Sequence, residues 1–186
     1  MNLDRRQLLT YAIGLVGGTV AVGAFGDTAP TGHGAGQAGY FSGSRRAVLD
    51  EVASLMIPAT DTPGALEVGV PGFIDRMMAT WASQDTKKAF DDLLDDVDAK
   101  AASALGKSFL SLEPGQRLAF LTQYDADHLT GDLKSMTGAY ARFKELLMSA
   151  YYLSEVGATQ ELRLEEVPGP FRGDIPVSEV GRSWAY

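Results

Sequence analysis

Apolar side chains recur at every third or fourth position through residues 42–154, and this spacing is typical of amphipathic helices. The first helix is expected over residues 42–56, because Pro58 lies just beyond its last apolar positions. A loop with a tight turn at Pro63-Gly64 follows. A second helix is expected to begin near Pro71.

Three further helices are expected before residue 156. Ser83 is placed to cap a long third helix, and Gly106 to end it. A fourth is expected from Glu113-Pro114 to about Tyr124, since proline fits the first helical turn, and a fifth from about residue 136 to 154. No alternating strand pattern exceeds four residues. The predicted fold class is therefore all-α, a small bundle of about five helices over residues 42–156.

The C-terminal segment, residues 157–186, follows a different pattern. Repeated Gly and Pro make it too broken for a helix or a central strand. It nevertheless carries apolar side chains that a disordered tail does not need, namely Leu162, Leu164, Val167, Phe171 and Ile175. The sequence predicts a long irregular arm that docks on another surface. That surface is either a partner protein or the chain's own helical domain, and both alternatives stay open.

The N-terminal segment, residues 1–26, has the pattern of a twin-arginine export signal. Arg5 and Arg6 precede an uncharged, mildly apolar run over residues 7–26. The predicted location is therefore the periplasm. A retained membrane anchor is the alternative, since about 20 residues of helix span a bilayer. Residues 27–41 form a Gly-rich linker, and the GxGxxG spacing inside it lacks the preceding strand of a dinucleotide site.

The net charge and the absence of cysteine exclude several classes of partner and of catalytic or metal site. The formal net charge is -8, which argues against nucleic acid as a partner. The chain has no cysteine, so disulfides, Cys-ligated metals, covalently attached haem and thiol catalysis are excluded.

The remaining candidates for chemistry are few. Two histidines, His33 and His128, lie too far apart in sequence for the close spacing of a zinc site. Acidic residues gather between positions 91 and 98, but lysines four residues away indicate a solvated helix face rather than a cation site. No catalytic, cofactor-binding or metal-binding residue is assigned.

Three long, irregular stretches go beyond a generic helical pattern. They are residues 57–65 with their continuation 69–75, residues 154–162, and residues 180–185. With the twin-arginine leader, they resemble the gluconate 2-dehydrogenase subunit 3 family over about residues 45–186. Those proteins are small exported subunits of periplasmic, flavin-dependent sugar and polyol dehydrogenases of the glucose–methanol–choline type.

The resemblance implies a non-catalytic subunit that binds no cofactor itself. In such complexes the large subunit holds FAD and performs the oxidation, and a cytochrome c commonly receives the electrons. The small subunit is expected to support folding, assembly and export of the flavoprotein through the twin-arginine translocase. An Fe–S cluster in the large subunit and haem c in a cytochrome partner stay open. The sugar or polyol is not determined, and the family has no agreed catalytic residues to transfer.

Docking on such a flavoprotein would use the end of the last helix and the arm. Proline-restricted backbone loses little entropy on docking, and Phe and Trp are types that dominate protein contacts. The expected docking residues are Tyr151, Tyr152, Glu155, Thr159, Gln160, Leu162, Phe171 and Trp184. Two other functions stay open, a stand-alone exported enzyme and a periplasmic binding module for a small ligand. A flavin on the chain alone would favour the first, and stabilisation by a ligand without a partner would favour the second.

Overall fold

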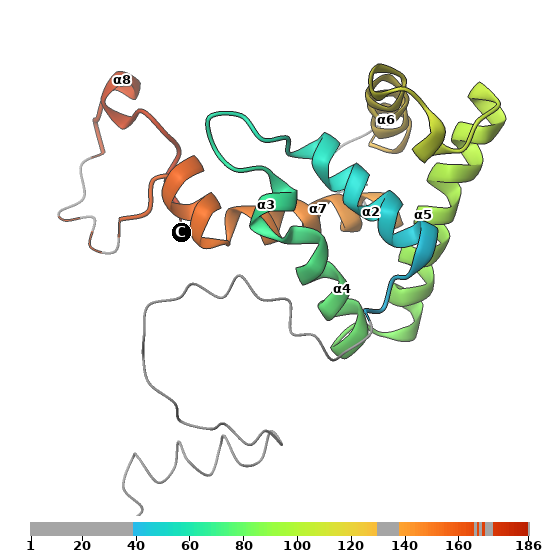
Figure 1. The fold of residues 1–186 in the computed structure, drawn as a ribbon. Coiled ribbons are helices and arrows are strands. Elements are labelled where there is room, and N and C mark those ends of the chain that lie inside the picture. Colours follow the sequence, from blue (N-terminus) through green and yellow to red (C-terminus); the bar gives the residue numbers. More distant parts are fainter. Residues whose placement is uncertain (1–38, 130–137, 166, 168, 170–172, 186) are drawn as a thin grey trace, which may run out of the picture. The chain divides into compact units, whose positions relative to one another are not determined.

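The computed structural model describes residues 39–129, 138–165, 167, 169 and 173–185, all within one compact unit that starts at residue 38. Arg5, Arg6, the linker up to residue 38 and Phe171 lie outside the described residues. The described part contains no β-strand, and five of its helices have eleven or more residues (Figure 1). The predicted all-α fold class is confirmed.

The first half of the domain follows the predicted helices closely. Helix α2 (Gly43–Met56) ends one residue before the Ile57-Pro58 pair. The predicted loop contains one short helix, α3 (Ala65–Val68), that the sequence pattern did not indicate. Gly69, with a φ of 82°, ends α3 and immediately starts α4 (Val70–Thr80).

The long third helix begins and ends where its caps predict. In α5 (Gln84–Leu105), the Ser83 hydroxyl accepts a 3.2 Å hydrogen bond from the backbone N–H of Thr86. Gly106 closes the helix in the left-handed conformation, at a φ of 72°. A single 3₁₀ turn, η1 (Phe109–Ser111), follows.

The last two long helices differ slightly from the prediction. Helix α6 (Pro114–His128) starts at the expected proline but continues one turn beyond Tyr124. That extra turn is polar and largely exposed, so the end of the apolar pattern came before the end of the helix. Helix α7 (Ala139–Tyr152) lies within the predicted span.

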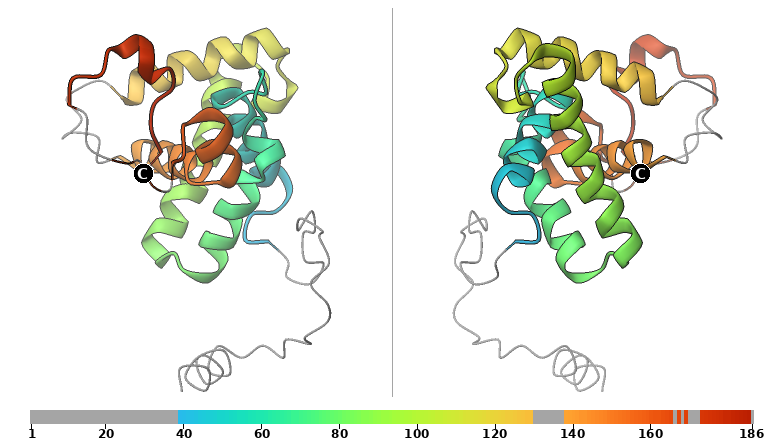
Figure 2. Two further views of the ribbon diagram at one scale, coloured as in Figure 1. Left: turned by 90° about the vertical axis from the view of Figure 1, so that its left-hand side faces the viewer. Right: turned by 90° about the vertical axis from the view of Figure 1, so that its right-hand side faces the viewer.

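The core lies between α2, α4, α5 and α7, which contact one another (Figures 1 and 2). Phe90 of α5 and Phe143 of α7 pack edge to face at its centre, with ring centroids 5.5 Å apart. The core side chains that are at most 1% exposed include Val48, Leu49, Val52, Ile74, Leu94, Phe109, Phe143 and Leu147. Burial of these four helix faces holds the bundle together.

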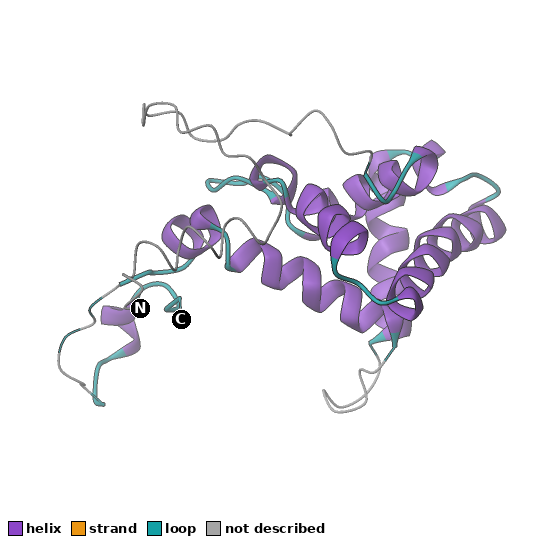
Figure 3. Cartoon of the chain, turned by 90° about the horizontal axis from the view of Figure 1, so that it is seen from below, coloured by secondary structure: helices purple, strands orange, loops and turns teal. Residues whose placement is uncertain are grey.

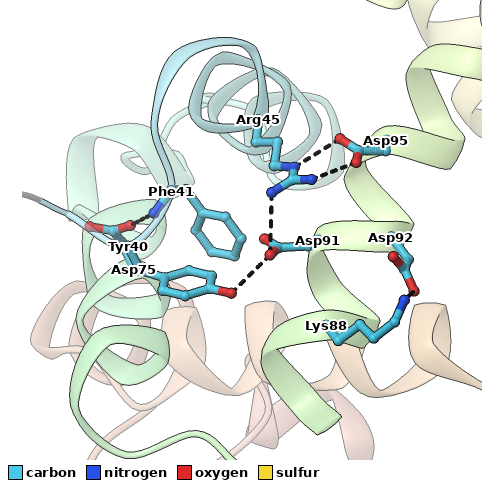
Figure 4. Close-up of polar contacts among 8 residues, drawn as sticks. All are labelled: Tyr40, Phe41, Arg45, Asp75, Lys88, Asp91, Asp92 and Asp95. Carbon is cyan, nitrogen blue, oxygen red and sulfur yellow. Dashed lines mark hydrogen bonds and ion pairs between the residues drawn. The ribbon is translucent and has the colours of Figure 1, made fainter. Parts of the chain in front are cut away.

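The acidic face of α5 is more than a solvated surface, which corrects the interpretation from sequence. Asp95 forms a two-pronged bond with Arg45 of α2, and Asp91 accepts a 2.9 Å hydrogen bond from the Tyr40 hydroxyl (Figure 4). Of the predicted pairs with lysines four residues away, Lys88–Asp92 and Lys100–Asp96 form. Lys87 lies over the ring of Tyr40 instead.

Two further carboxylates of α5 hold the elements that follow it. Asp96 accepts a 2.7 Å hydrogen bond from the Tyr124 hydroxyl of α6. Asp98 accepts from the backbone N–H of Phe109, at 2.8 Å, and so caps η1. These acids therefore connect α5 to α6 and η1. No group of residues that could hold a metal ion occurs in the described part of the chain.

One buried carboxylate fixes the point where the chain enters the domain. Asp75 of α4 is 6% exposed and accepts a 2.7 Å hydrogen bond from the backbone N–H of Phe41 (Figure 4). The Phe41 side chain is itself in the core. In the residues described, no helix is both long enough and apolar enough to cross a membrane.

Candidate functional site

The C-terminal end of α7 turns sharply around Ser154 and Gly157. The Ser154 hydroxyl donates to the carbonyl of Tyr151 at 2.6 Å and accepts from the N–H of Gly157 at 3.0 Å. A Cβ at position 157 would lie 2.1 Å from the Tyr151 carbonyl oxygen, so only glycine fits. The conspicuous Ser-Glu-Val-Gly stretch is therefore a turn that needs these residue types.

Beyond Gly157 the chain forms one turn of π-helix, η3 (Gly157–Glu161), closed by the N–H of Leu162 on the Gly157 carbonyl at 2.8 Å (Figure 3). The sequence pattern was interpreted as too broken for a helix here, and for these five residues this is wrong. A second short helix, α8 (Val177–Val180), lies later in the arm. The glycine that suggests an irregular chain instead allows the turn to pack against α7.

The loop of residues 57–65 lies against this turn. The Thr62 hydroxyl donates to the Glu161 carboxylate at 2.7 Å, and the Tyr151 hydroxyl donates to the Pro63 carbonyl at 2.8 Å. Within the loop, the N–H of Ala65 donates a 2.9 Å hydrogen bond to the Ile57 carbonyl. Two of the three irregular stretches seen in the sequence are thus joined directly.

The third stretch completes the arrangement. Arg163 and Trp184 form an isolated parallel bridge, with the Arg163 N–H on the Ser183 carbonyl at 2.8 Å. The Arg163 guanidinium lies 4.3 Å from the centre of the Trp184 ring, and Arg182 donates to the Gln160 carbonyl. We call the combined region, residues 57–65, 151–164 and 182–185, the α7 corner.

An open groove of about 860 Å³ runs through the α7 corner. It is lined by Tyr152, Leu153, Ser154, Glu155, Ala158, Glu161, Leu162, Leu164, Arg182, Ser183, Trp184 and Ala185. Leu153 is 79% exposed beside it and Leu164 is 46% exposed. Large apolar side chains held at the edge of a groove are a feature of protein-docking surfaces.

The predicted docking residues do not all lie in the groove. Tyr152, Glu155, Leu162 and Trp184 line it, whereas Thr159 and Gln160 are exposed on η3 outside it. Tyr151 is only 2% exposed, so its side chain has no surface to offer a partner and instead positions the 57–65 loop. Phe171 lies outside the described residues.

Reasoning from the sequence missed Leu153 and Arg182. Leu153 was counted as part of the apolar helix pattern, although it is the residue just after α7 ends. Its position beside the Ser154 turn was the available signal, since a residue there leaves the helix face. Arg182 is held at the groove by its hydrogen bond to the carbonyl of Gln160, which lies 22 residues earlier in the chain. No local sequence pattern indicates such a contact.

A second polar cluster lies where α6 meets α7, away from the corner residues. The Tyr124 hydroxyl donates to Asp96, and the Tyr140 hydroxyl donates to Asp125. Burial is the larger cause of the raised pKa of each tyrosine, and the hydrogen bond to the carboxylate is the second. His128, at the end of α6, stacks on the Tyr124 ring with centroids 4.0 Å apart. These tyrosines stay protonated and act as donors that fix α6 in place.

Comparison with known proteins identifies the family. The family model described as gluconate 2-dehydrogenase subunit 3 matches residues 44–169. The chain belongs to this family. The predicted resemblance is thereby confirmed, and the matched range includes the first two stretches of the α7 corner but not residues 180–185. No curated protein and no solved structure gives a significant match.

Proposed function

We propose that this chain is the non-catalytic small subunit of an exported, FAD-dependent sugar or polyol dehydrogenase of the glucose–methanol–choline type. Membership of a dehydrogenase-subunit family supports a role within a dehydrogenase complex. One observation carries the docking role: two segments distant in sequence, residues 152–164 and 182–185, line a single open groove that leaves large apolar side chains exposed. We assign that groove to the flavoprotein.

Hydrogen bonds within the single chain connect the groove walls. The Arg163–Ser183 bond joins the two sides, and the Thr62–Glu161 bond braces one side from the 57–65 loop. A surface that is ordered before binding loses less conformational entropy when the partner arrives. The half-buried Trp184 and the exposed Leu153 are then available as contact residues, and Trp is a type that often dominates binding energy.

In this proposal the twin-arginine leader serves both subunits. The flavoprotein folds around FAD before export, and the route used by twin-arginine signals carries folded cargo. A flavoprotein held by the α7 corner would cross to the periplasm with the leader that begins at Arg5-Arg6. Electrons would then pass from FAD to a separate acceptor such as a cytochrome c.

Affinity capture of the full-length chain from the periplasm of its own host tests the proposal. A tag is joined to the C-terminus by a flexible spacer, and the eluate is examined for flavin absorbance and a second, larger polypeptide. The expected result is a yellow complex that oxidises a sugar or polyol. A chain that elutes alone and colourless would overturn the accessory role.

A matched pair of variants tests the docking groove itself. Trp184→Ala is expected to lower the captured flavin about tenfold, because it removes a large side chain from the groove. Trp81→Ala is the control, since Trp81 is 79% exposed at the end of α4 and does not line the groove. Equal capture by both variants would remove the groove from the interface and leave the complex itself in place.

A further inference from the structure

A second groove lies between α4 and α7, and it shares only Leu153 and Ser154 with the first. Its volume is about 320 Å³. It is lined by Val68, Gly69, Val70, Phe73 and Arg76 on one side and by Leu146, Ser149, Ala150, Leu153 and Ser154 on the other. Most of these side chains are apolar, and Phe73 is 39% exposed.

The lining residues have the spacing of helix faces. On α7 and just beyond it they lie at 146, 149, 150 and 153, which is the i, i+3, i+4, i+7 pattern of one face. An adjacent face of α7, with Phe143, Leu147 and Tyr151, is already buried in the core. Leu146 and Ala150 pack partly against the core, but the remaining surface of this face, with the exposed Leu153, lies open in the groove.

The α4 side of the groove repeats this pattern. Positions 69, 73 and 76 lie on one helix face, while Ile74 and Met78 point into the core. Two neighbouring helices that each present a row of side chains leave a groove between the rows. Such a groove accepts the ridge of a third helix.

The charge of Arg76 indicates which residue a helix bound in this groove would carry. The Arg76 guanidinium has no ion pair or hydrogen bond with any residue in the described ranges. By contrast, Arg45, Arg46 and Arg117 each face a carboxylate. An arginine at the edge of an apolar groove is well suited to bind a carboxylate that arrives with the partner.

A second copy of this chain is a poor occupant. A two-fold dimer through this groove would bring the same lining against itself. That lining contains Arg76 but no Asp or Glu, so a symmetric contact supplies no carboxylate from the groove. The occupant has to bring its own acidic residue.

We propose that the α4–α7 groove binds one amphipathic helix of the flavoprotein subunit, with an acidic residue on that helix paired to Arg76. This inference rests on the proposed function and deepens it. It gives the complex a second contact, adjacent to the α7 corner and of different chemistry. The corner offers an arm and a tryptophan, whereas this groove selects a helix by its apolar face and its charge.

The first test is a photo-cross-link from inside the groove. Phe73→p-benzoylphenylalanine is introduced into the full-length chain, which is co-expressed with the flavoprotein, and the cross-linked peptide is identified by mass spectrometry. The expected product joins position 73 to one segment of the larger polypeptide that contains Asp or Glu. A cross-link to a second copy of this chain, or no cross-link in a captured complex, would overturn the inference.

The second test uses the charge. Arg76→Glu is expected to reduce flavoprotein capture at least about tenfold, and Lys at the cross-linked acidic position of the partner is expected to restore it. Lys107→Glu is the matched control, because Lys107 is exposed, lies outside both grooves and gives the same charge change.

The outcomes separate this inference from the proposed function. If the wild-type chain captures the flavoprotein and both charge variants capture it equally well, the helix groove is wrong and the accessory role stands. If the wild-type chain captures no flavoprotein, both fall together. Thermal unfolding of each variant confirms that these exposed substitutions leave the fold intact.

Discussion

The acidic face of α5 and the α7 corner use polar groups in opposite ways. On α5, Asp91, Asp95 and Asp98 each bind another segment of the same chain. At the corner, hydrogen bonds hold the backbone while Leu153, Leu164 and Trp184 are left beside an open groove. The first region completes the fold. The second is also held by several hydrogen bonds, but its apolar side chains are left exposed. This difference is the one that the proposed docking role rests on, since exposed apolar groups beside a groove are a feature of interaction surfaces.

The largest contrast is expected between a core residue and an exposed residue of α7 and its end. Phe143 is 1% exposed, so Phe143→Ala leaves a cavity against Phe90 and should lower the free energy of unfolding by about 4 kcal/mol. Leu153→Ala, at a position 79% exposed, should change it by less than about 0.5 kcal/mol. Urea unfolding measures both. A large loss of stability from the Leu153 variant would show that the corner supports the fold after all.

A pair of glycines sharpens the role of the turn. Gly157→Ala places a Cβ against the Tyr151 carbonyl and is expected to lower the free energy of unfolding by about 2 kcal/mol and to weaken flavoprotein capture. Gly115→Ala, in the first turn of α6, has no atom within 4 Å of the new Cβ. It should be neutral or stabilise by about 0.5 kcal/mol. Equal effects of the two changes would mean that the corner can relax around a side chain.

The smallest expected effect is on the stability of the fold at acidic pH. The hydrogen bond from Arg45 lowers the pKa of Asp95 below its ordinary value of 3.8. For Asp96, burial acts to raise the pKa, but the hydrogen bonds from Tyr124 and Lys100 outweigh it and the pKa is lowered. Each carboxylate thus stabilises the fold above its ordinary pKa. That contribution is lost as the pH falls below about 4.

Thermal unfolding across this acidic range measures the contribution. Asp95→Asn should make the loss of stability on acidification shallower, and Arg45→Gln should do so at least as strongly, because it removes both this pair and the Arg45–Asp91 ion pair. The effect is small, since the Asp95 side chain is 54% exposed and solvent screens the pair. The double variant should behave like Arg45→Gln alone, since that change already removes the partner of Asp95. Unchanged acid sensitivity in all three would show that the pair contributes nothing.

Sequence reasoning succeeded where the cause is local. Ser83 and Gly106 mark the ends of α5 because a cap acts within one helical turn. The all-α class follows from the spacing of apolar residues for the same reason. The end of α6 was missed by one turn because its last residues face solvent and carry no apolar signal.

The candidate site was predicted only in part because its contacts are distant in sequence. Thr62 and Glu161 are 99 positions apart, and nothing local shows that they meet. Tyr151 was assigned to the docking surface because α7 has apolar residues on two faces, and spacing alone does not tell which face the core takes. The acids of α5 were assigned to solvent for a similar reason, since Tyr40 lies 51 positions before Asp91.

Leu153 lines both grooves, so the two contacts of the proposed complex are not independent. A partner segment in either groove would fix the Leu153 side chain, and the loss of its rotamer freedom, about 0.5–1 kcal/mol, then occurs once for two contacts. Binding at one groove would therefore favour binding at the other, a cooperativity that arises with no change of shape. The expected gain in affinity at the second groove is a factor of about two to five.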